Sequence, residues 1–325
     1  MISRFRLTLY LAAALCGSLP GFSNAADPVW PTKTVRVVVP YAPGGVTDIV
    51  ARIVAERLGS ALGQGFIGDN RPGGDTDIGT LYVAKQAPDG YTLLVSGNVA
   101  QSSIFATPPY DPVKDIAPVS RLFDVVMILA ENIKVPAKNV NEFLAYARSQ
   151  SGKIALAHPA IGGPHHFYLE LLMLEAKFDA LRVPYKGGVP MVTALSTGEV
   201  QFSIGGVNTL KPQDDGGRVR MLAVIGPKRS ALAPGLPSIK EALPTFDAPG
   251  TWAAMYATAG TPRPVIDRLN AEVVRIVRDP TLAAQTLGPN GLEAVGSTPE
   301  ELGTMVKDDL AKFKSIAARA NMTLK

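Results

Sequence analysis

The sequence alternates between short β-branched runs and longer helical patterns, and glycine-containing turns often join the two. The stretch VVVPYAPGGVTDIVAR shows this best, because 35–41 predicts a buried parallel strand and apolar residues from Ile49 to Leu62 recur at helical spacing. Further strands are predicted at 92–97, 125–130, 153–158, 181–185, 200–206, 219–226 and 251–258. Helices are predicted at 140–150, 165–176, 191–198, 262–278, 280–288 and 298–318. This alternation is typical of α/β architecture with mostly parallel sheets.

The alternation falls into two units, one before about residue 125 and one after it. Three C-terminal helical patterns follow and could pack back on the first unit. We therefore expect domain I to comprise 26–125 and 250–325, and domain II to comprise 126–249, with a ligand cleft between them. At 325 residues the chain is long enough for two such domains.

The first 25 residues have the pattern of a secretory signal peptide. Arg4 and Arg6 precede the apolar run LTLYLAAALCGSL, and the small residues SNA end at Ala25, where we expect cleavage. A membrane anchor is the weaker alternative, because the run is short of the roughly 20 residues that span a bilayer. The single cysteine, Cys16, lies in this segment, so the mature chain has no thiol for a disulfide or a nucleophile. We expect a soluble protein in the periplasm.

Charge gives no sign of a nucleic-acid partner. Without Arg4 and Arg6 the 32 basic residues become 30 against 28 acidic ones, which leaves a formal charge of +2. No cluster of lysine and arginine interleaved with aromatic residues is found in the sequence.

The turn PYAPGGVTD at 40–48 follows the first strand and opens the first helix. Ligands bind at this place in open α/β sheets, and the free N–H groups of a helix start favour an anion. The turn has neither the Gly-Lys-Ser/Thr of a P-loop nor GxGxxG spacing. The alternative is an ordinary turn in which Thr47 or Asp48 caps the helix.

Two later turns have the same organisation. In AHPAIGGPHHFYLELL, the pair Gly162 and Gly163 precedes Pro164, and all three histidines, His158, His165 and His166, lie within nine residues. A zinc site is conceivable, but the spacing is not HExxH, and capping, core packing or a solvated surface are the alternatives. In VPYKGGVP, Tyr185 and its neighbouring lysine could reach a polar ligand or could simply be solvated.

Catalytic patterns are not found in the sequence. There is no GxSxG, SxxK or HExxH pattern, and the carboxylates are scattered. The stretch NRPGGDTDIG at 70–79 does not have the residue order of a calcium loop and is interpreted as a glycine-rich surface loop. We assign no catalytic residue, no metal ligand and no cofactor.

The ordered set WPTKTVRVVVPYAPGGVTDIVAR, NRPGG, APDGYTLL, PYDPVKDIAPVS, VPYKGG and TPRPVIDRLNAEV resembles the Bug-type receptors of tripartite tricarboxylate transporters. The resemblance runs from about Trp30 to the C-terminus. It implies a type II-like periplasmic binding protein of two domains that closes on a small organic carboxylate, with each domain a mostly parallel sheet flanked by helices. It also implies membrane transporter subunits as partners, and we expect a monomer.

The family's carboxylate site is made largely by backbone groups of the first βα loop and its counterpart in the second domain. Here His166 fits the family's usual histidine, but the second loop lacks its two serines, and Ile204-Gly205 replaces the usual Phe-Asp. The resemblance therefore implies an apolar, roomier distal pocket. The residues expected to bind the ligand are Tyr41, Pro43, Gly44, Gly45, Thr47, Asp48, Ser96, Asn98, His158, Ile161, Gly162, Gly163, His165, Tyr185, Gly187 and Gly205.

Two other functions are weighed against solute capture. The liganded protein could present its surface to a sensor kinase without feeding a transporter. It could also be a periplasmic hydrolase that uses His165 or His166 as a base, although the missing serines in that loop weaken this reading.

Overall fold

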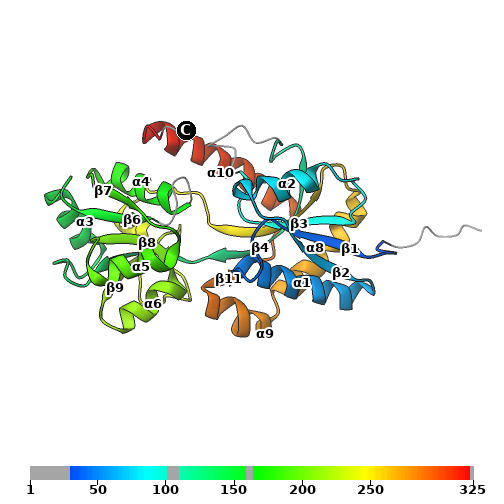
Figure 1. The fold of residues 1–325 in the computed structure, drawn as a ribbon, viewed down its shortest axis with the longest axis horizontal. Coiled ribbons are helices and arrows are strands. Elements are labelled where there is room, and N and C mark those ends of the chain that lie inside the picture. The colour runs from blue at the N-terminus through cyan, green and yellow to red at the C-terminus, as the bar shows by residue number, and fades with distance from the viewer. Residues whose placement is uncertain (1–29, 101–109, 159–163, 323–325) are drawn as a thin grey trace, which may run out of the picture.

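The structure, a computed structural model, describes residues 30–100, 110–158 and 164–322 (Figure 1). Two mixed sheets lie beside each other, each is flanked by helices, and strands pass directly between them. This arrangement is the two-unit α/β architecture that the sequence predicts.

The first sheet has two buried faces, as its apolar strands predict. Its strands are β1 (Val35–Val39), β2 (Phe66–Asn70), β3 (Thr92–Ser96), β4 (Ile116–Val125), β10 (Trp252–Thr258) and β11 (Leu292–Ala294), in the order β11-β4-β10-β3-β1-β2. Val37 and Val39 of β1 pack with helices α1 (Val46–Leu62) and α8 (Arg263–Val277). Val38 packs on the other face with α2 (Asp77–Ala84) and α10 (Pro299–Arg319).

The second sheet is also covered on both faces. It contains β5 (Met127–Asn132), β6 (Ala155–His158), β7 (Leu181–Pro184), β8 (Phe202–Gly206) and β9 (Val219–Val224), in the order β7-β6-β8-β5-β9. One face packs against α3 (Val140–Ser149), α4 (Pro164–Ala176) and the short α7 (Ile239–Ala242). The other packs against α5 (Gly188–Thr197) and α6 (Val207–Asp215).

The expectation of mostly parallel sheets is wrong, because both sheets are mixed. β1 is parallel to β2 and β3, and β6 is parallel to β7 and β8. β10 is antiparallel to β3 and β4, and β5 is antiparallel to β8 and β9. The reason lies in the chain path: β1 and β3 end where the sheets meet, whereas β10 and β5 begin there.

Several elements differ from the predicted ones. The expected strand at 125–130 is the junction of β4 and β5, which are separated by Val126. The expected surface loop at 70–79 ends early, because α2 begins at Asp77. The expected helix at 280–288 is only the three-residue α9 (Pro280–Leu282), followed by a π-helical turn and a 3₁₀ turn that contains Pro289. The elements that were not predicted are β2, α2, β4, α6, α7 and β11.

Two predicted helix ends are confirmed. Gly198 ends α5 in the left-handed conformation, with φ +85°, which costs glycine little. Thr298 caps α10, where its hydroxyl accepts from the Glu301 N–H and the Glu301 carboxylate accepts from the Thr298 N–H.

Helix α10 packs against both units. Leu302 and Val306 lie in the core beside the first sheet, whereas Phe313 and Ile316 lie in the core of the second. The rings of Phe313 and Phe167 of α4 are 5.0 Å apart. The idea that the C-terminal helices return to the first unit is therefore incomplete, because α10 bridges the two (Figure 1).

No helix within 30–100, 110–158 or 164–322 is long and apolar enough to cross a membrane. The expected signal peptide, residues 1–25, lies outside the described residues. Cleavage after Ala25 stays a prediction.

The bridging role of α10 predicts a large cost for Phe313→Ala. The ring is 1% exposed, and its loss leaves a cavity between α10 and α4, so we expect the free energy of unfolding to fall by about 3–4 kcal/mol. Lys314→Ala, on the exposed side of α10, is the control and should change it by less than about 0.5 kcal/mol. Urea denaturation followed by circular dichroism measures both, and equal effects would contradict the bridging role.

Candidate functional site

The parallel strands β1 and β6 both end on the side of their sheet that faces the other sheet. The two turns predicted to bind the ligand follow β1 and β6 in the sequence. In the first unit, the residues after β1 and β3 are tied together, because the Gly97 N–H donates to the Tyr41 hydroxyl at 3.1 Å. In the second unit, the residues after β6 and β7 are neighbours, and the Tyr185 N–H donates to the His158 carbonyl at 2.9 Å. Ile161, Gly162 and Gly163 lie outside the described residues.

Asp48 shapes the first turn from inside. Its carboxylate, 2% exposed, accepts from the Gly44 N–H at 2.9 Å, from Arg52 Nε at 3.0 Å and from Asn70 Nδ2 at 2.8 Å. Burial acts to raise the pKa of Asp48, but these hydrogen bonds outweigh it and leave the pKa below its ordinary value. With its oxygens used in this way, Asp48 supports the site rather than offering itself to a ligand.

The first helical turn of α1 keeps its backbone donors open. The N-cap residue Gly45 has no side chain, and Asp48 of the first turn makes a capping contact with the Gly44 N–H rather than with the first N–H groups of the helix itself. Gly44 has φ +86°, and Pro43, Gly44 and Gly45 are exposed. The N–H groups of Gly45, Val46 and Thr47 meet no acceptor in the described part of the chain, as is usual for a helix start. Such a turn can hold an anion.

Asn98 and Ser96 are used by the fold. The Asn98 side chain donates to Asp309 Oδ2 of α10 at 2.7 Å and accepts from the Ala100 N–H at 3.1 Å. Ser96 is 1% exposed within β3. Asn98 therefore also has a structural role, and Asp309 has a supporting role that the sequence did not reveal.

The second side contains a buried polar network around Glu170 of α4. Arg182 donates to its carboxylate through Nε at 2.5 Å and Nη2 at 2.9 Å, and His166 Nε2 lies 3.4 Å from Glu170 Oε1. The His166 ring stacks on His158, with centroids 4.8 Å apart and planes 9° apart. The sequence analysis missed Glu170 and Arg182, although the spacing of His166 and Glu170, four residues apart on a helix, could have indicated the first.

Protonation states in this network follow from its contacts. Burial acts to raise the pKa of Glu170, but the hydrogen bonds from His166 and Arg182 outweigh it and lower the pKa to about 2. Burial, helped by the neighbouring His158, lowers the pKa of His165 to about 4. Glu170 is therefore charged and His165 neutral at pH 7. Nowhere in the described residues do three metal-ligating side chains gather as a metal site would require.

Two other residues predicted to bind the ligand, Tyr185 and Gly205, contact other parts of the second unit. The Tyr185 hydroxyl donates to Glu199 Oε1 at 2.8 Å, so a structural partner occupies it. A Cβ on Gly205 would lie 3.2 Å from Leu210 Cδ1 and 3.3 Å from Met191 Cε, in the apolar core between α5 and α6. A side chain at position 205 would therefore meet this core, whereas the contact expected between Gly205 and the ligand stays a prediction. Gly187, with φ +104°, begins α5.

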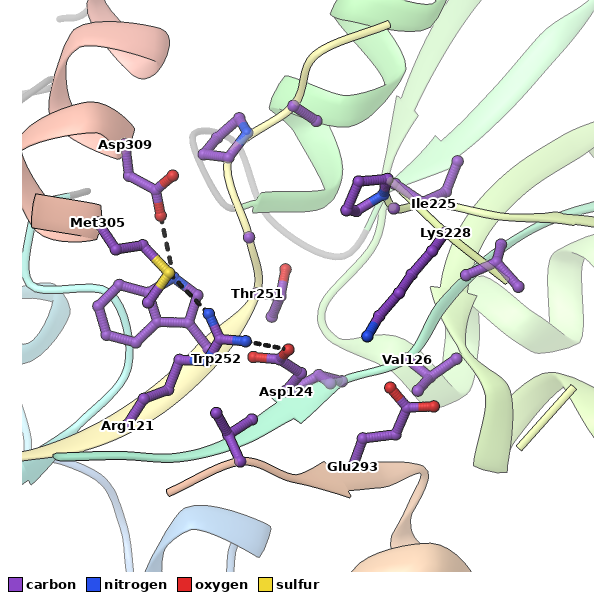
Figure 2. Close-up of a pocket in the computed structure, with 18 of the residues that line it drawn as sticks. Arg121, Asp124, Val126, Ile225, Lys228, Thr251, Trp252, Glu293, Met305 and Asp309 are labelled. Carbon is purple, nitrogen blue, oxygen red and sulfur yellow. Dashed lines mark hydrogen bonds and ion pairs between the residues drawn. The ribbon is translucent and has the colours of Figure 1, made fainter. Parts of the chain in front are cut away.

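A cavity of about 890 Å³ lies between the units near β4, β10, β11 and α10 (Figure 2). None of the residues predicted to bind the ligand lines this cavity. It is separate from the two turns and is considered below.

Comparisons with known proteins point to one family. A family model described as tripartite tricarboxylate transporter family receptor matches residues 50–322. The chain is 30% identical over 321 residues to protein BugT of Bordetella pertussis, covering 96% of this chain and 98% of that protein.

Two solved structures with named ligands share the fold. One is R. palustris Rpa4515 with adipate, with TM-score 0.74 and 32% identity, covering 90% of this chain and 98% of that one. The other is MatC from Rhodopseudomonas palustris with bound malate, with TM-score 0.70 and 30% identity, covering 88% of this chain and 99% of that one. Adipate and malate are both small dicarboxylates.

The Glu170 network predicts a particular pH dependence. Because the folded pKa of Glu170 is lowered to about 2, its contribution to stability is present above about pH 4.5 and is lost as the pH falls toward 2. Glu170→Gln should lower the free energy of unfolding by about 3 kcal/mol at pH 7, and by much less at pH 3.

Chemical denaturation at pH 3, 5 and 7 measures this difference. Glu300→Gln, at an exposed ion pair with Arg263, is the control and should cost less than about 1 kcal/mol at every pH. A Glu170→Gln effect of the same size at pH 3 and pH 7 would show that the network does not stabilise the charged carboxylate.

Proposed function

The chain belongs to the tripartite tricarboxylate transporter receptor family, and we propose on this premise that it is a periplasmic solute-binding protein. It captures a small organic carboxylate by domain closure and delivers it to a transporter of the tripartite tricarboxylate type. The observation that carries this proposal is the β1–α1 turn, which presents open N–H donors at a helix start, held in shape by the buried Asp48.

The ligand class is inferred from the site and from the relatives. Backbone donors at a helix start favour a carboxylate without requiring a cationic side chain. Structures of similar proteins are described with adipate and with malate, so a dicarboxylate of this size is the first class to test. The second contact is proposed to come from the opposite unit, where His158 ends β6 and His165 lies in the first turn of α4.

The proposed domains are 26–125 with 250–325, and 126–249. The division of the strands between the two sheets supports these limits, because the chain passes from one sheet to the other at Val126 and again before β10. Closure about these connections would bring the two turns together around the ligand.

The proposal includes export, action as a monomer and no enzymatic activity. The pattern at 1–25 supports export to the periplasm after cleavage. The match to a receptor family favours solute binding over a hydrolase, and the His166 ring and Arg182 both contact the Glu170 carboxylate as parts of one structural network. A sensor kinase as the recipient has no observation in its favour.

Carboxylates should stabilise the mature chain against heat. Adipate and malate are expected to raise the melting temperature in a thermal-shift assay, because a ligand that binds only the folded state adds its binding free energy. The uncharged diamide of adipate is the control and should give no shift. No shift with any compound from a panel of mono-, di- and tricarboxylates would refute the proposed function.

Val46→Pro tests the turn itself. Val46 is the first residue of α1, a position that tolerates proline, and Gly45 already has the extended conformation required before proline, with φ −71° and ψ 160°. The change removes one N–H donor and keeps the helix. We expect affinity for adipate to fall roughly tenfold, since a hydrogen bond to a charged group contributes about 1.5–3 kcal/mol.

Val46→Ala is the matched control, because it trims the side chain but retains the N–H. Isothermal titration calorimetry measures both variants. If Val46→Pro binds adipate as tightly as Val46→Ala, this N–H does not contact the carboxylate.

A further inference from the structure

The cavity between the units is built from both of them. From the first unit it is lined by the end of β4, by Glu293 of β11 and by Met305 and Asp309 of α10. From the second unit it is lined by the loop 224–230 that follows β9. A rotation of one unit against the other about the connecting strands therefore changes the width of this cavity.

Sheet order places the cavity on the far side of the connecting strands from the proposed site. In the first sheet, β3 and β1 lie on one side of the β10–β4 pair and β11 lies on the other. In the second sheet, β8, β6 and β7 lie on one side of β5 and β9 lies on the other. The cavity contains residues of β11 and of the loop after β9, so the cavity and the two turns lie on opposite sides.

Lys228 of the loop 224–230 extends into this cavity toward Asp124 and Glu293 (Figure 2). It is exposed and makes no ion pair with a residue that the structure describes. The other cations of the cavity are occupied: Arg121 pairs with Asp124, Arg229 pairs with Glu241, and Lys240 and Lys312 both pair with Asp247.

The carboxylates that face Lys228 are only partly satisfied. Asp124 accepts from Arg121 Nη2 at 2.6 Å, and its pKa is raised to about 6, chiefly by burial. Glu293 accepts from the Ser230 hydroxyl at 2.5 Å, which already joins the loop to β11. Lys228 lowers the pKa of Asp124, whereas Glu293 and Asp309 raise it, so a cation is favoured among these three acids.

We propose that Lys228 sets ligand affinity from outside the site, by pairing with Asp124 and Glu293 when the ligand cleft opens. Narrowing the cavity brings the loop 224–230 toward β4 and β11, and rotation about the connecting strands then widens the cleft on their other side. The pair is not formed in the described structure, forms only when the cavity narrows further, and so favours the open form and is broken on closure. This inference rests on the proposed capture by closure.

Removing the charge should therefore shift the protein toward the closed form. A partly exposed ion pair contributes little free energy, so Lys228→Gln should tighten carboxylate binding by about threefold to tenfold. Lys228→Arg keeps the charge and should behave as the wild type. These changes touch no residue of the two turns.

Spin labels can measure the shift without any ligand. Ile67, 60% exposed, lies in β2, and Val189, 79% exposed, lies at the start of α5 just after β7; β2 and β7 are the outer strands on the cleft side of the two sheets. In the chain from residue 26 onward, cysteines at these two positions carry the labels, and double electron–electron resonance gives the distance distribution across the cleft. The single native cysteine, Cys16, is not part of this chain, so labelling is confined to the chosen positions.

The expected result is a shorter mean distance in Lys228→Gln than in the wild type, with Lys228→Arg unchanged. Lys314→Gln, an exposed lysine of α10 outside the cavity, is the control for loss of one charge and should leave the distribution unchanged. An unaltered distribution in Lys228→Gln, or the same shift in Lys228→Arg, would overturn the proposal. Because no ligand is added, this outcome is independent of whether adipate or malate binds.

Discussion

The structure depends on the way the backbone passes between the two sheets at Val126. Its N–H donates to the Gly291 carbonyl at 2.9 Å, and its carbonyl accepts from the Val207 N–H at 2.9 Å, so one residue is bonded to both units. Next to it, the Val125 N–H donates to the Thr251 carbonyl at 2.8 Å, which ties the two connections together. This junction directs the ends of the parallel strands toward each other, and the cavity of about 890 Å³ lies on one side of it.

Buried carboxylates then organise what the strand ends present. Asp48 holds the turn after β1 through three hydrogen bonds, and Glu170 holds the second side through Arg182 and His166. Asp309 fixes Asn98 and the Trp252 indole N–H at 2.7 and 2.9 Å. Each acid serves the shape of the site, so in the proposed function an anion would be recognised by backbone donors.

Local patterns in the sequence predicted the parts of this arrangement that depend on local physics. The four valines of the run 35–39 are buried, whereas Arg36 is exposed, and Gly198 and Thr298 end or begin helices as their chemistry requires. β4 was not predicted because Pro118, Arg121 and Asp124 interrupt its apolar pattern. Its pairing with β10 also joins residues that are far apart in the chain, which the local sequence does not show. The partners of Asn98, Tyr185 and Gly205 are set by tertiary packing, which spacing cannot reveal.

The position of β10 in the first sheet has a consequence for how the chain reaches its folded state. This strand lies between β4 and β3, yet it is made only after the whole second sheet, whose strands run without interruption from Met127 to Val224. The strands of the second sheet are therefore made first, whereas the first sheet can be completed only after β10 and α10 have been made. Because Phe313 and Ile316 of α10 also lie in the core of the second unit, both cores reach their final packing only when the C-terminal helix is present.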